Sequence, residues 1–415
     1  MKFIHAADIH LDSPLCGLAR YEGAPIEQIQ SATRRAFINM IELACDEKVD
    51  FILLSGDLYD VDWKDYNTGL FFNQQMSKLR EAQIPVFLIL GNHDAGSHIT
   101  KQLRLPDNVR ELSSQQPETI ALDHLGVAIH GQSFPDKTVT ENLSARYPQA
   151  LPGYFNIGML HTALNGRQDH APYAPCTLSD LLSHNYDYWA LGHVHQHEIV
   201  HQSPWVVFPG NLQGRHARET GSKGCLLVST SDHQHLSLLY RPMDVLRWEV
   251  CQFEISDMVH IDDLIDRARS EIIQAVHHAQ GRFLAVRFIL EGKSALHSEL
   301  HSQKERWTNE IRTVATDAGS GHVWVEKIQL RTQAFHPPNL QEGPLGELIE
   351  TLHALPEDQE TLQMLSAEFR ALKTALPAEA RHHHDVGIDP DNPETIRRLL
   401  PGVEELLLTR LLARE

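Results

Sequence analysis

The chain is predicted to begin with an α/β domain, to continue with a small α+β unit and to end in a helical tail. Apolar runs such as Val49–Leu54 and Pro85–Leu90 alternate with stretches of helical periodicity such as Ser31–Ala44. Near-continuous apolar strands between helices are typical of sheets that are covered on both faces. The pattern changes near residues 245 and 333, so we expect domains at 1–245, 246–333 and 334–415.

The first region consists of short apolar strands and amphipathic helices. Helices are expected at Ser31–Ala44 and Tyr66–Ala82, where apolar residues recur at helical spacing. The residues expected to face the core are Ala36, Met40, Leu43, Leu70, Phe71 and Leu79. The remaining elements are strands at Lys2–Ala6, Val49–Leu54, Pro85–Leu90, Tyr154–Leu160, Tyr188–Leu191 and Trp205–Phe208, a hairpin of Thr119–Leu122 with Val127–His130, and a short helix at Thr177–Ser183.

The later regions have a different element order. The α+β unit is expected to contain Arg247–Ile255, Ile261–His278, Arg282–Glu291, Ser294–Ala318 and His322–Arg331, as strand, helix, strand, helix and strand. Tail helices are expected at Leu345–Leu355, Pro356–Leu376 and Pro393–Arg414. The leucine-rich stripe of the last helix packs on the protein itself or binds a partner. His382, His383 and His384 belong to an accessory metal tract or to a solvated linker.

Composition limits the class of protein. The chain has 415 residues and 42% hydrophobic content, which suits two or three globular domains. No segment approaches the roughly 18 apolar residues of a membrane helix, and the N-terminus does not resemble a signal peptide, so we expect a cytoplasmic protein. The five cysteines form no Cys-x-x-Cys pattern and are expected to be buried thiols. A net charge of −19 argues against a protein that coats nucleic acid through its overall charge, because phosphate contacts require a basic surface.

Five strand-like runs each end in residues of the kinds that bind metals. These clusters are Asp8-Ile9-His10, Gly56-Asp57, Gly91-Asn92-His93-Asp94, His161 and Gly192-His193-Val194-His195. Carboxylate, amide and imidazole donors suit Mn, Fe or Zn. In open α/β sheets, ligands bind beyond the carboxyl ends of the strands. The clusters are therefore expected to form one two-metal pocket. If these residues were only caps at strand ends, chance would rarely place every donor type in this order.

The spacing of these residues suggests a role for each. Asp57 is expected to bridge two cations about 3.5–4 Å apart, because a carboxylate offers two oxygens. The predicted metal ligands are Asp8, His10, Asp57, Asn92, His161, His193 and His195. His93 is expected to be a general acid, with a bystander as the alternative. Asp94 is expected to orient His93 and thus to be catalytic, or else to be a turn residue.

The ordered clusters resemble the signature of calcineurin-like metallophosphoesterases. The opening Phe3–Pro14 and the segments Pro209–Arg215 and Arg218–Thr220 are similar to the bacterial YhaO group, which is related to the SbcD-type nuclease subunit of DNA double-strand-break repair. The resemblance implies a four-layer α/β/β/α sandwich, two divalent metal ions, usually Mn²⁺, and DNA exonuclease or endonuclease activity. In that reaction a metal-bridging hydroxide attacks the phosphodiester.

The resemblance also assigns residues to the two metals. It implies that Asp8, His10, Asp57 and His195 hold one ion, and that Asp57, Asn92, His161 and His193 hold the other, with His93 catalytic. Some members of the family carry a histidine three residues after the bridging aspartate, where this chain has Asp60. This difference leaves the balance of exonuclease and endonuclease activity open.

The resemblance further implies partners. A small α+β capping domain and a C-terminal helical segment are expected, and that segment would dock on an SMC-like coiled-coil ATPase of the YhaN or SbcC type; pairing of two copies stays open. Two other functions remain: a phosphatase or phosphodiesterase acting on nucleotides or phosphoproteins, and a mainly structural subunit that binds DNA ends. Arg215 and Arg218 either contact phosphate or form surface salt bridges.

Overall fold

The computed structural model describes residues 1–13, 25–60, 66–96, 104–164, 173–233, 235–334, 343–369 and 392–412. The chain divides into two compact units. The first consists of Met1–Gln252, Asp266–Ile289 and Asn309–Gln329, and the second of Phe253–Ile265, Leu290–Thr308 and Leu330–Glu415. The domain boundaries expected at residues 245 and 333 stay a prediction.

Four parallel strands form most of a first six-stranded sheet. They are β1 (Lys2–Ala6), β2 (Phe51–Ser55), β3 (Val86–Ile89) and β4 (Val109–Glu111). The antiparallel strands β11 (Gly224–Ser229) and β12 (Ser237–Pro242) complete the order β12-β11-β1-β2-β3-β4. Helices α1 (Ile26–Glu47) and α2 (Asn67–Glu81) pack their apolar stripes on one face, where Ile4 meets Phe37 and Phe72 in one cluster.

The second sheet also has six strands, in the order β5-β6-β7-β8-β10-β9. They are β5 (Glu118–Leu122), β6 (Val127–Gly131), β7 (Phe155–His161), β8 (Tyr188–Gly192), β9 (Glu198–Gln202) and β10 (Trp205–Phe208). The four inner strands are parallel and the two edge strands are antiparallel. The helix α4 (Leu178–Leu182) and the 3₁₀ helix η3 (Leu143–Arg146) pack on its outer face through Leu181 and Leu143.

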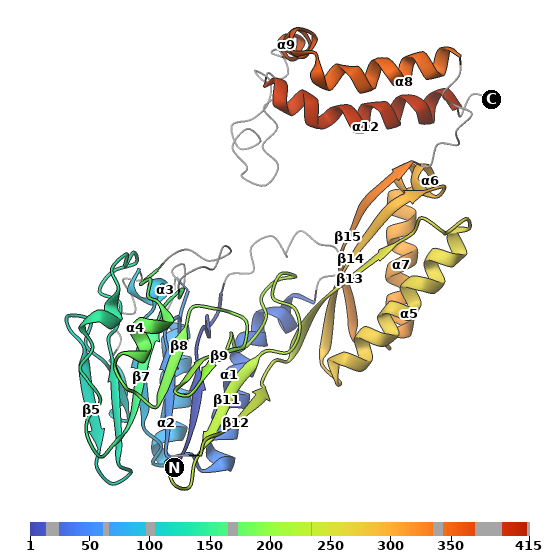
Figure 1. Ribbon diagram of the computed structural model, residues 1–415. Helices are drawn as coiled ribbons and strands as arrows, with labels where there is room; N and C mark the ends of the chain where they lie inside the picture. Colours follow the sequence, from blue (N-terminus) through green and yellow to red (C-terminus); the bar gives the residue numbers. More distant parts are fainter. Residues whose placement is uncertain are drawn as a thin grey trace. The chain divides into compact units, whose positions relative to one another are not determined.

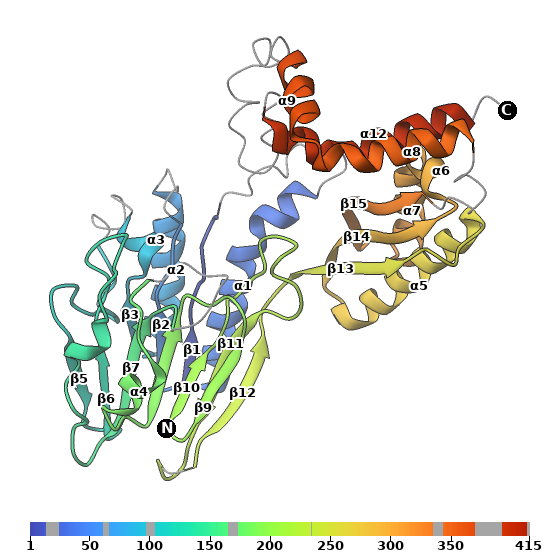
Figure 2. The ribbon, with the colours of Figure 1, turned by 45° about the horizontal axis from the view of Figure 1, so that its top comes forward.

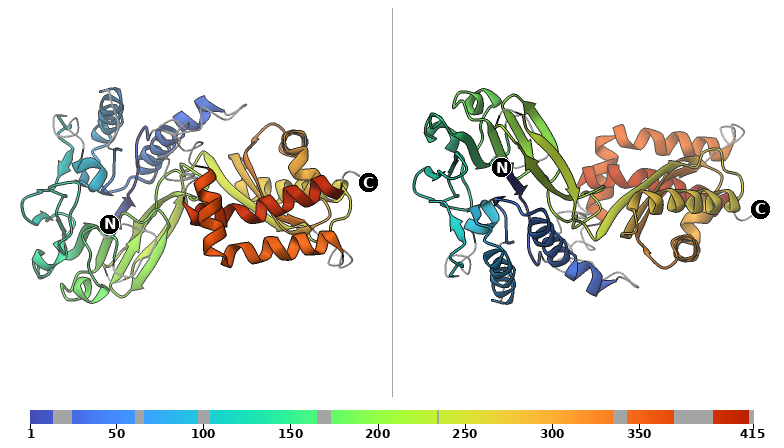
Figure 3. Two further views of the ribbon diagram at one scale, coloured as in Figure 1. Left: turned by 90° about the horizontal axis from the view of Figure 1, so that it is seen from above. Right: turned by 90° about the horizontal axis from the view of Figure 1, so that it is seen from below.

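The inner faces of the two sheets pack on each other around aromatic side chains. Phe3 stacks on Phe51 with ring centroids 4.9 Å apart and meets Tyr188 edge-on at 5.5 Å. Full burial of each such side chain stabilises the fold by roughly 1.5–3 kcal/mol. In Figure 3 the blue helices α1 and α2 lie on one side of the sandwich, and the teal and green second sheet lies on the other. The predicted α/β/β/α sandwich is confirmed.

The structure differs from the predicted elements in the strands near the sheet edges. Strands β4, β9, β11 and β12 were not predicted, and three of them are edge strands. An edge strand has one solvated side, so its sequence lacks the continuous apolar run of a central strand. Leu70 was expected to face inward but is 60% exposed, because the buried face of α2 is formed by Phe72, Met76 and Leu79.

A three-stranded sheet follows the sandwich in the chain. Its strands β13 (Leu246–Glu254), β14 (Phe283–Ser294) and β15 (Val323–Ala334) lie in that order, and α5 (Ile261–Ala279) runs alongside them (Figure 2). The single helix expected at 294–318 is two helices, α6 (His297–Ser302) and α7 (Lys304–Ala318). They separate at Gln303, whose φ of −118° and ψ of 34° leave the helical region.

Three α-helices and the 3₁₀ helix η5 (Leu355–Glu357) form the described part of the tail. The α-helices are α8 (Pro344–Ala354), α9 (Gln359–Glu368) and α12 (Pro393–Leu412). Helices α8 and α12 lie side by side (Figure 1), and Leu362 of α9 packs with Ile396 and Leu400 of α12. His382, His383 and His384 lie outside the described residues. Among the residues that are described, no helix is long and apolar enough to span a membrane.

Candidate metal centre

The predicted ligands converge where the parallel strands of both sheets end. Asp8 and His10 follow β1, Asp57 follows β2, and Asn92 begins the short helix α3 (Asn92–Ala95) after β3. His161 ends β7, and His193 and His195 follow β8. The first sheet thus supplies both carboxylates and the amide, and the second supplies three of the four imidazoles.

The backbone turns sharply at these residues. The φ angles of Asp8, His10, Asp57 and His193 are 53°, 47°, 53° and 98°, which place all four in the left-handed region. Such conformations cost on the order of 1–3 kcal/mol each and persist only when the surroundings enforce them. Two backbone hydrogen bonds of 3.0 Å do so here, from the Asp8 N–H to the Gly56 carbonyl and from the His10 N–H to the Asp57 carbonyl.

Asp8, His10 and His195 form the first group of donors, with their ligand atoms within 4.8 Å of one another. Nε2 of His195 lies 3.3 Å from Nε2 of His10 and 3.7 Å from Oδ1 of Asp8. Two imidazole nitrogens that face each other at this distance need a proton or a cation between them, because two lone pairs repel. The Asp8 carboxylate is held in place by the His193 N–H at 3.0 and 3.1 Å.

Asp57, His161 and His193 form the second group. Nδ1 of His161 donates to the carbonyl of Ser55 at 2.9 Å, which turns Nε2 toward the pocket. That Nε2 lies 3.1 Å from Oδ1 of Asn92 and 3.4 Å from Oδ2 of Asp57. The same Asp57 oxygen lies 3.9 Å from Nε2 of His10. Asp57 therefore stands between the two groups, as a bridging carboxylate must.

The second donor group stabilises positive charge. Burial alone would lower the pKa of His161, but the carboxylates of Asp57 and Asp8 raise it to about 9. Burial would likewise raise the pKa of Asp57, yet His161 and His10 hold it below its usual range. A metal ion that replaces the proton meets the same charges, so the donor set fits two divalent cations. Asp8, His10 and His195 would hold one, and Asn92, His161 and His193 the other, with Asp57 shared.

Two glycines leave room for this arrangement. A Cβ atom at Gly91 would lie 2.3 Å from Oδ1 of Asp57, and one at Gly192 would lie 1.9 Å from the Ser55 carbonyl oxygen. Both distances are far below ordinary van der Waals contact. Glycine at these positions therefore allows the backbone to approach the ligands closely.

His93 lies beside the two groups and pairs with a residue that was not expected. Its Nδ1 lies 2.6 Å from Oδ1 of Asp60, and this contact raises the pKa of His93 against the effect of burial. The buried Asp94 carboxylate instead accepts the N–H groups of Leu58, Tyr59 and Gly91. The prediction that Asp94 orients His93 is wrong, because this carboxylate reaches back to cap the start of its own helix. Asp60 makes the contact instead.

The residues behind His195 were also missed. Nδ1 of His195 lies 2.7 Å from Oε1 of Glu219, whose carboxylate also accepts the backbone N–H of Arg215 at 2.7 Å. Nζ of Lys223 donates to the carbonyl of His195 at 2.8 Å. Glu219 lies in the segment Arg218–Thr220 that resembles the YhaO group, but this similarity reveals neither the partner nor the distance.

A third group, His10, Asp60 and His93, also lies within 4.8 Å. Nη1 of Arg215 lies 3.4 Å from Oδ2 of Asp60, so a guanidinium already supplies positive charge there. A cation in the same place would be repelled, and we interpret these residues as an orienting pair beside a metal ligand. The ion pairing expected for Arg215 is present, and its contact with phosphate stays a prediction.

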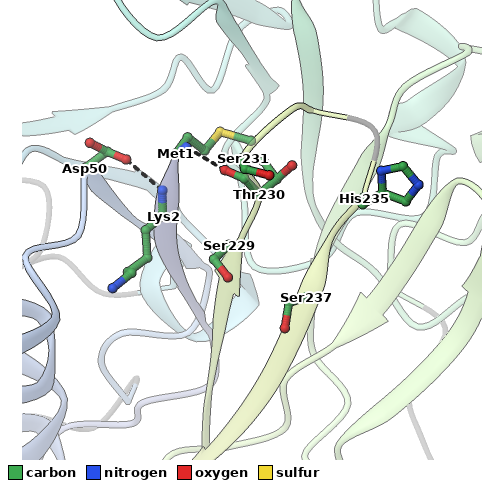
Figure 4. Close-up of a pocket in the computed structure, with 8 residues that line it drawn as sticks. All are labelled: Met1, Lys2, Asp50, Ser229, Thr230, Ser231, His235 and Ser237. Carbon is green, nitrogen blue, oxygen red and sulfur yellow. Dashed lines mark hydrogen bonds between the residues drawn. The ribbon is translucent and has the colours of Figure 1, made fainter.

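A hollow of about 510 Å³ lies at the opposite end of β1 from the metal centre, since Lys2 begins this strand and Asp8 follows its end (Figure 4). It is lined by Met1, Lys2, Asp50, Ser229, Thr230, Ser231, His235 and Ser237. The Lys2 N–H donates to Asp50 at 2.6 Å and the Met1 amino group to the Thr230 carbonyl at 2.8 Å. These groups satisfy one another, and the hollow contributes nothing to the metal chemistry.

Comparison with known proteins agrees with this geometry. A family model described as calcineurin-like phosphoesterase matches residues 1–197, and one described as the middle domain of metallophosphoesterase YhaO matches residues 248–333. The chain is 36% identical over 296 residues to the uncharacterized metallophosphoesterase YhaO of Bacillus subtilis, a match that covers 70% of this chain and 72% of that protein. It is 27% identical over 232 residues to the DNA double-strand break repair protein Mre11 of Methanopyrus kandleri, covering 51% and 48%.

Two solved structures are also similar at low identity. One is a dimetal phosphatase from Danio rerio, with 9% identity and a TM-score of 0.39 over 59% of this chain and 96% of that one. The other is TT1561 of Thermus thermophilus, with 15% identity and a TM-score of 0.33 over 58% and 98%. Likenesses of this size carry no inference about the reaction.

Proposed function

The chain belongs to the calcineurin-like metallophosphoesterases, within the YhaO group, and on this basis we propose that it is a two-metal-dependent nuclease that hydrolyses DNA phosphodiester bonds. The observation that carries the proposal is the position of Asp57, whose Oδ2 faces His161 at 3.4 Å and His10 at 3.9 Å. One carboxylate shared by two donor groups is the arrangement that two-metal phosphoester hydrolysis requires. Bound cations, with Mn²⁺ as our proposal, would polarise the phosphate and lower the pKa of a bound water.

The residues of the chain contribute positioning and proton transfer. Asn92 and the histidines of both sheets fix the places of the ions, so the phosphate binds in one orientation. His93 lies next to the donor groups with Nδ1 held by Asp60, which leaves Nε2 to protonate the departing oxygen. The raised pKa of His93 favours the protonated form that a general acid requires.

We propose DNA as the specific substrate because the chain is similar to the DNA double-strand break repair protein Mre11. The net charge of −19 opposes binding to DNA, which is also negatively charged. We propose that a partner supplies part of the DNA grip: an SMC-like coiled-coil ATPase in the cytoplasm. Its docking surface would be α12, where Leu399, Val403 and Leu411 are exposed. Exposed apolar residues along one helix are typical of a partner-binding surface.

The catalytic proposal is tested with purified protein and Mn²⁺. Linear labelled DNA and a chromogenic phosphodiester should both be cut, and a chromogenic phosphomonoester much more slowly. Asp57→Ala should lose bound metal and activity together. His93→Ala should keep the metal but lose about 10²–10⁴-fold in rate, whereas the exposed control His124→Ala should behave as wild type.

Each alternative function has its own outcome in that assay. Intact DNA beside a hydrolysed monoester would replace the nuclease with a phosphatase. Binding of DNA ends without bound metal or hydrolysis would favour a structural subunit. If His93→Ala retains full activity, the general acid has been assigned to the wrong residue.

The partner proposal is tested separately on α12. Leu399→Ser with Val403→Ser should abolish co-purification with the ATPase and leave metal content unchanged. Leu362, Ile396 and Leu400, which pack together, are left unchanged. The control Ile273→Ser changes an equally exposed apolar residue of α5. Equal loss of binding in the control, or no loss in the α12 variant, would remove α12 as the docking surface.

A further inference from the structure

Arg215 is a charged residue of the metal centre to which the proposed reaction gives no task. It follows β10, and its side chain is 15% exposed. Nη1 lies 3.4 Å from Oδ2 of Asp60, and Nη2 lies 3.1 Å from Oε1 of Glu219. One guanidinium thus joins two carboxylates from distant parts of the chain, one after β2 and the other after β10.

Each of these carboxylates holds one histidine of the site in the same way. Oδ1 of Asp60 lies 2.6 Å from Nδ1 of His93, and Oε1 of Glu219 lies 2.7 Å from Nδ1 of His195. Both contacts engage Nδ1 and so direct Nε2 away from the carboxylate. For His195, Nε2 then faces His10 and Asp8 in the first donor group. A carboxylate behind a ligating imidazole commonly fixes its tautomer and its ring orientation.

We propose that Arg215 is a positioning residue for both histidines, so that the metal-holding His195 and the proton-donating His93 are oriented as one coupled unit. The guanidinium fixes the two carboxylates, and each carboxylate fixes one ring. The inference rests on the proposed function for the role of His93. It adds a residue that acts through Asp60 and Glu219 without touching the metals or the substrate.

The chemistry of arginine suits this task. Its guanidinium is planar, and separate N–H groups point at the two carboxylates, whereas a lysine ammonium is a point charge that can face only one closely. Because the side chain is largely buried, water screens these ion pairs weakly. A released Asp60 would also compete for the metal centre, since its Oδ2 lies only 3.8 Å from Nδ1 of His10.

A direct phosphate contact is the competing role for Arg215. Both terminal nitrogens already face protein oxygens, and Nη1 lies 3.4 Å from Oγ of Ser13 as well as from Asp60. A substrate phosphate could be bound only by breaking these contacts. The geometry therefore favours a role in positioning, and the two roles differ in what a substitution changes.

The decisive experiment measures Mn²⁺ binding by calorimetry, without substrate, on the full-length chain. Arg215→Met and Glu219→Gln should each weaken the binding of one of the two ions by about 10–100-fold, the usual effect of losing a partner behind a metal ligand. The Mn²⁺ dissociation constant of the double variant should be at most about twice that of the single variant that binds more weakly. Both changes break the same coupled unit, so their effects should not multiply. Arg80→Met, which removes an exposed arginine of α2, should bind Mn²⁺ as wild type does.

A second readout follows the acid histidine. In Arg215→Met and in Asp60→Asn, hydrolysis of a diester with a poor leaving group should fall at least tenfold more than hydrolysis of a p-nitrophenyl diester, which needs little protonation. Arg215→Lys keeps the charge but lacks the separate N–H groups of the guanidinium. It should restore either the wild-type Mn²⁺ affinity or the wild-type leaving-group dependence, and not both. This variant also keeps the test valid if Arg215→Met folds poorly.

The outcomes separate this inference from the proposed function. Wild-type Mn²⁺ affinity in Arg215→Met would overturn the coupling. A double variant whose loss of Mn²⁺ affinity equals the product of the two single losses would overturn it too. A rise in KM for DNA with unchanged metal affinity and leaving-group dependence would overturn it too, in favour of phosphate contact. If the wild type binds Mn²⁺ but cuts no phosphodiester, the proposed function fails, and the calorimetric cycle still decides the role of Arg215.

Discussion

Replacing Gly91 by alanine tests the geometry of the metal centre without changing any donor atom. Gly91 has a φ of −95° and a ψ of −169°, which an alanine adopts without backbone strain. The new Cβ would nevertheless lie 2.3 Å from Oδ1 and 2.8 Å from N of Asp57. The substitution therefore acts by crowding Asp57, at both its carboxylate and its backbone.

The size of the effect follows from that overlap. An unstrained contact lies at about 3.5 Å, so the carboxylate or the backbone must retreat by roughly 1 Å. A displacement of about 1 Å at a reacting centre costs on the order of 10²-fold in rate, which corresponds to about 2.7 kcal/mol of activation free energy. Overpacking costs a further 1–3 kcal/mol or so of stability. Mn²⁺ affinity should fall as well, because Asp57 faces both donor groups.

Calorimetry with Mn²⁺ and kcat/KM on a chromogenic diester measure these effects. Gly402→Ala is the matched control, since nothing lies within 4 Å of its new Cβ, and alanine suits the helix α12. Wild-type Mn²⁺ affinity and turnover in Gly91→Ala would refute the reasoning, because Asp57 would then have no fixed place against Gly91.

Three further predictions concern stability, each measured by urea unfolding. Burial lowers the pKa of His5 to about 3. The neutral form of His5 therefore contributes its full stabilisation above pH 6.5. Between pH 6.5 and pH 3 this contribution to the free energy of unfolding falls by about 1.4 kcal/mol per pH unit. Between pH 7 and pH 5 the free energy of unfolding of His5→Gln should therefore fall by about 2 kcal/mol less than that of the wild type. Equal falls in the two proteins would contradict this. Arg247→Met should cost about 3 kcal/mol, because the buried Asp244 carboxylate loses a partner at 2.9 Å; a change below about 1 kcal/mol would mean that the pair is not desolvated. Thr177→Ala should cost about 1 kcal/mol, because the Thr177 hydroxyl caps α4, whereas Thr177→Ser should cost little.

The donor residues of the metal centre could be predicted from sequence because one rule places them. Polar residues directly after apolar strands lie at the carboxyl edge of a sheet, so Asp8, Asp57 and His161 were expected together. In the structure His161 lies 3.4 Å from Asp57, and Asp8 lies 3.7 Å from His195. The rule needs only local patterns. It does not need to know which strands are neighbours or that there are two sheets.

The orienting carboxylates could not be found in this way, because they depend on contacts between distant segments. Glu219 is 24 positions from His195, and Asp60 is 33 positions from His93. Asp94 was the wrong choice because adjacency to His93 in sequence was taken for contact. Position N3 of a helix points its side chain back to the helix start, away from its neighbour.

The division of the donors between the two sheets has a consequence for synthesis. The first sheet brings Asp8, His10, Asp57 and Asn92 early in the chain, but His161, His193 and His195 belong to the second sheet. A chain still emerging from the ribosome therefore holds half of a metal centre until roughly its midpoint has been made. The pocket is completed only when the two sheets dock, so a chain that ends before His193 lacks a donor for each of the two ions.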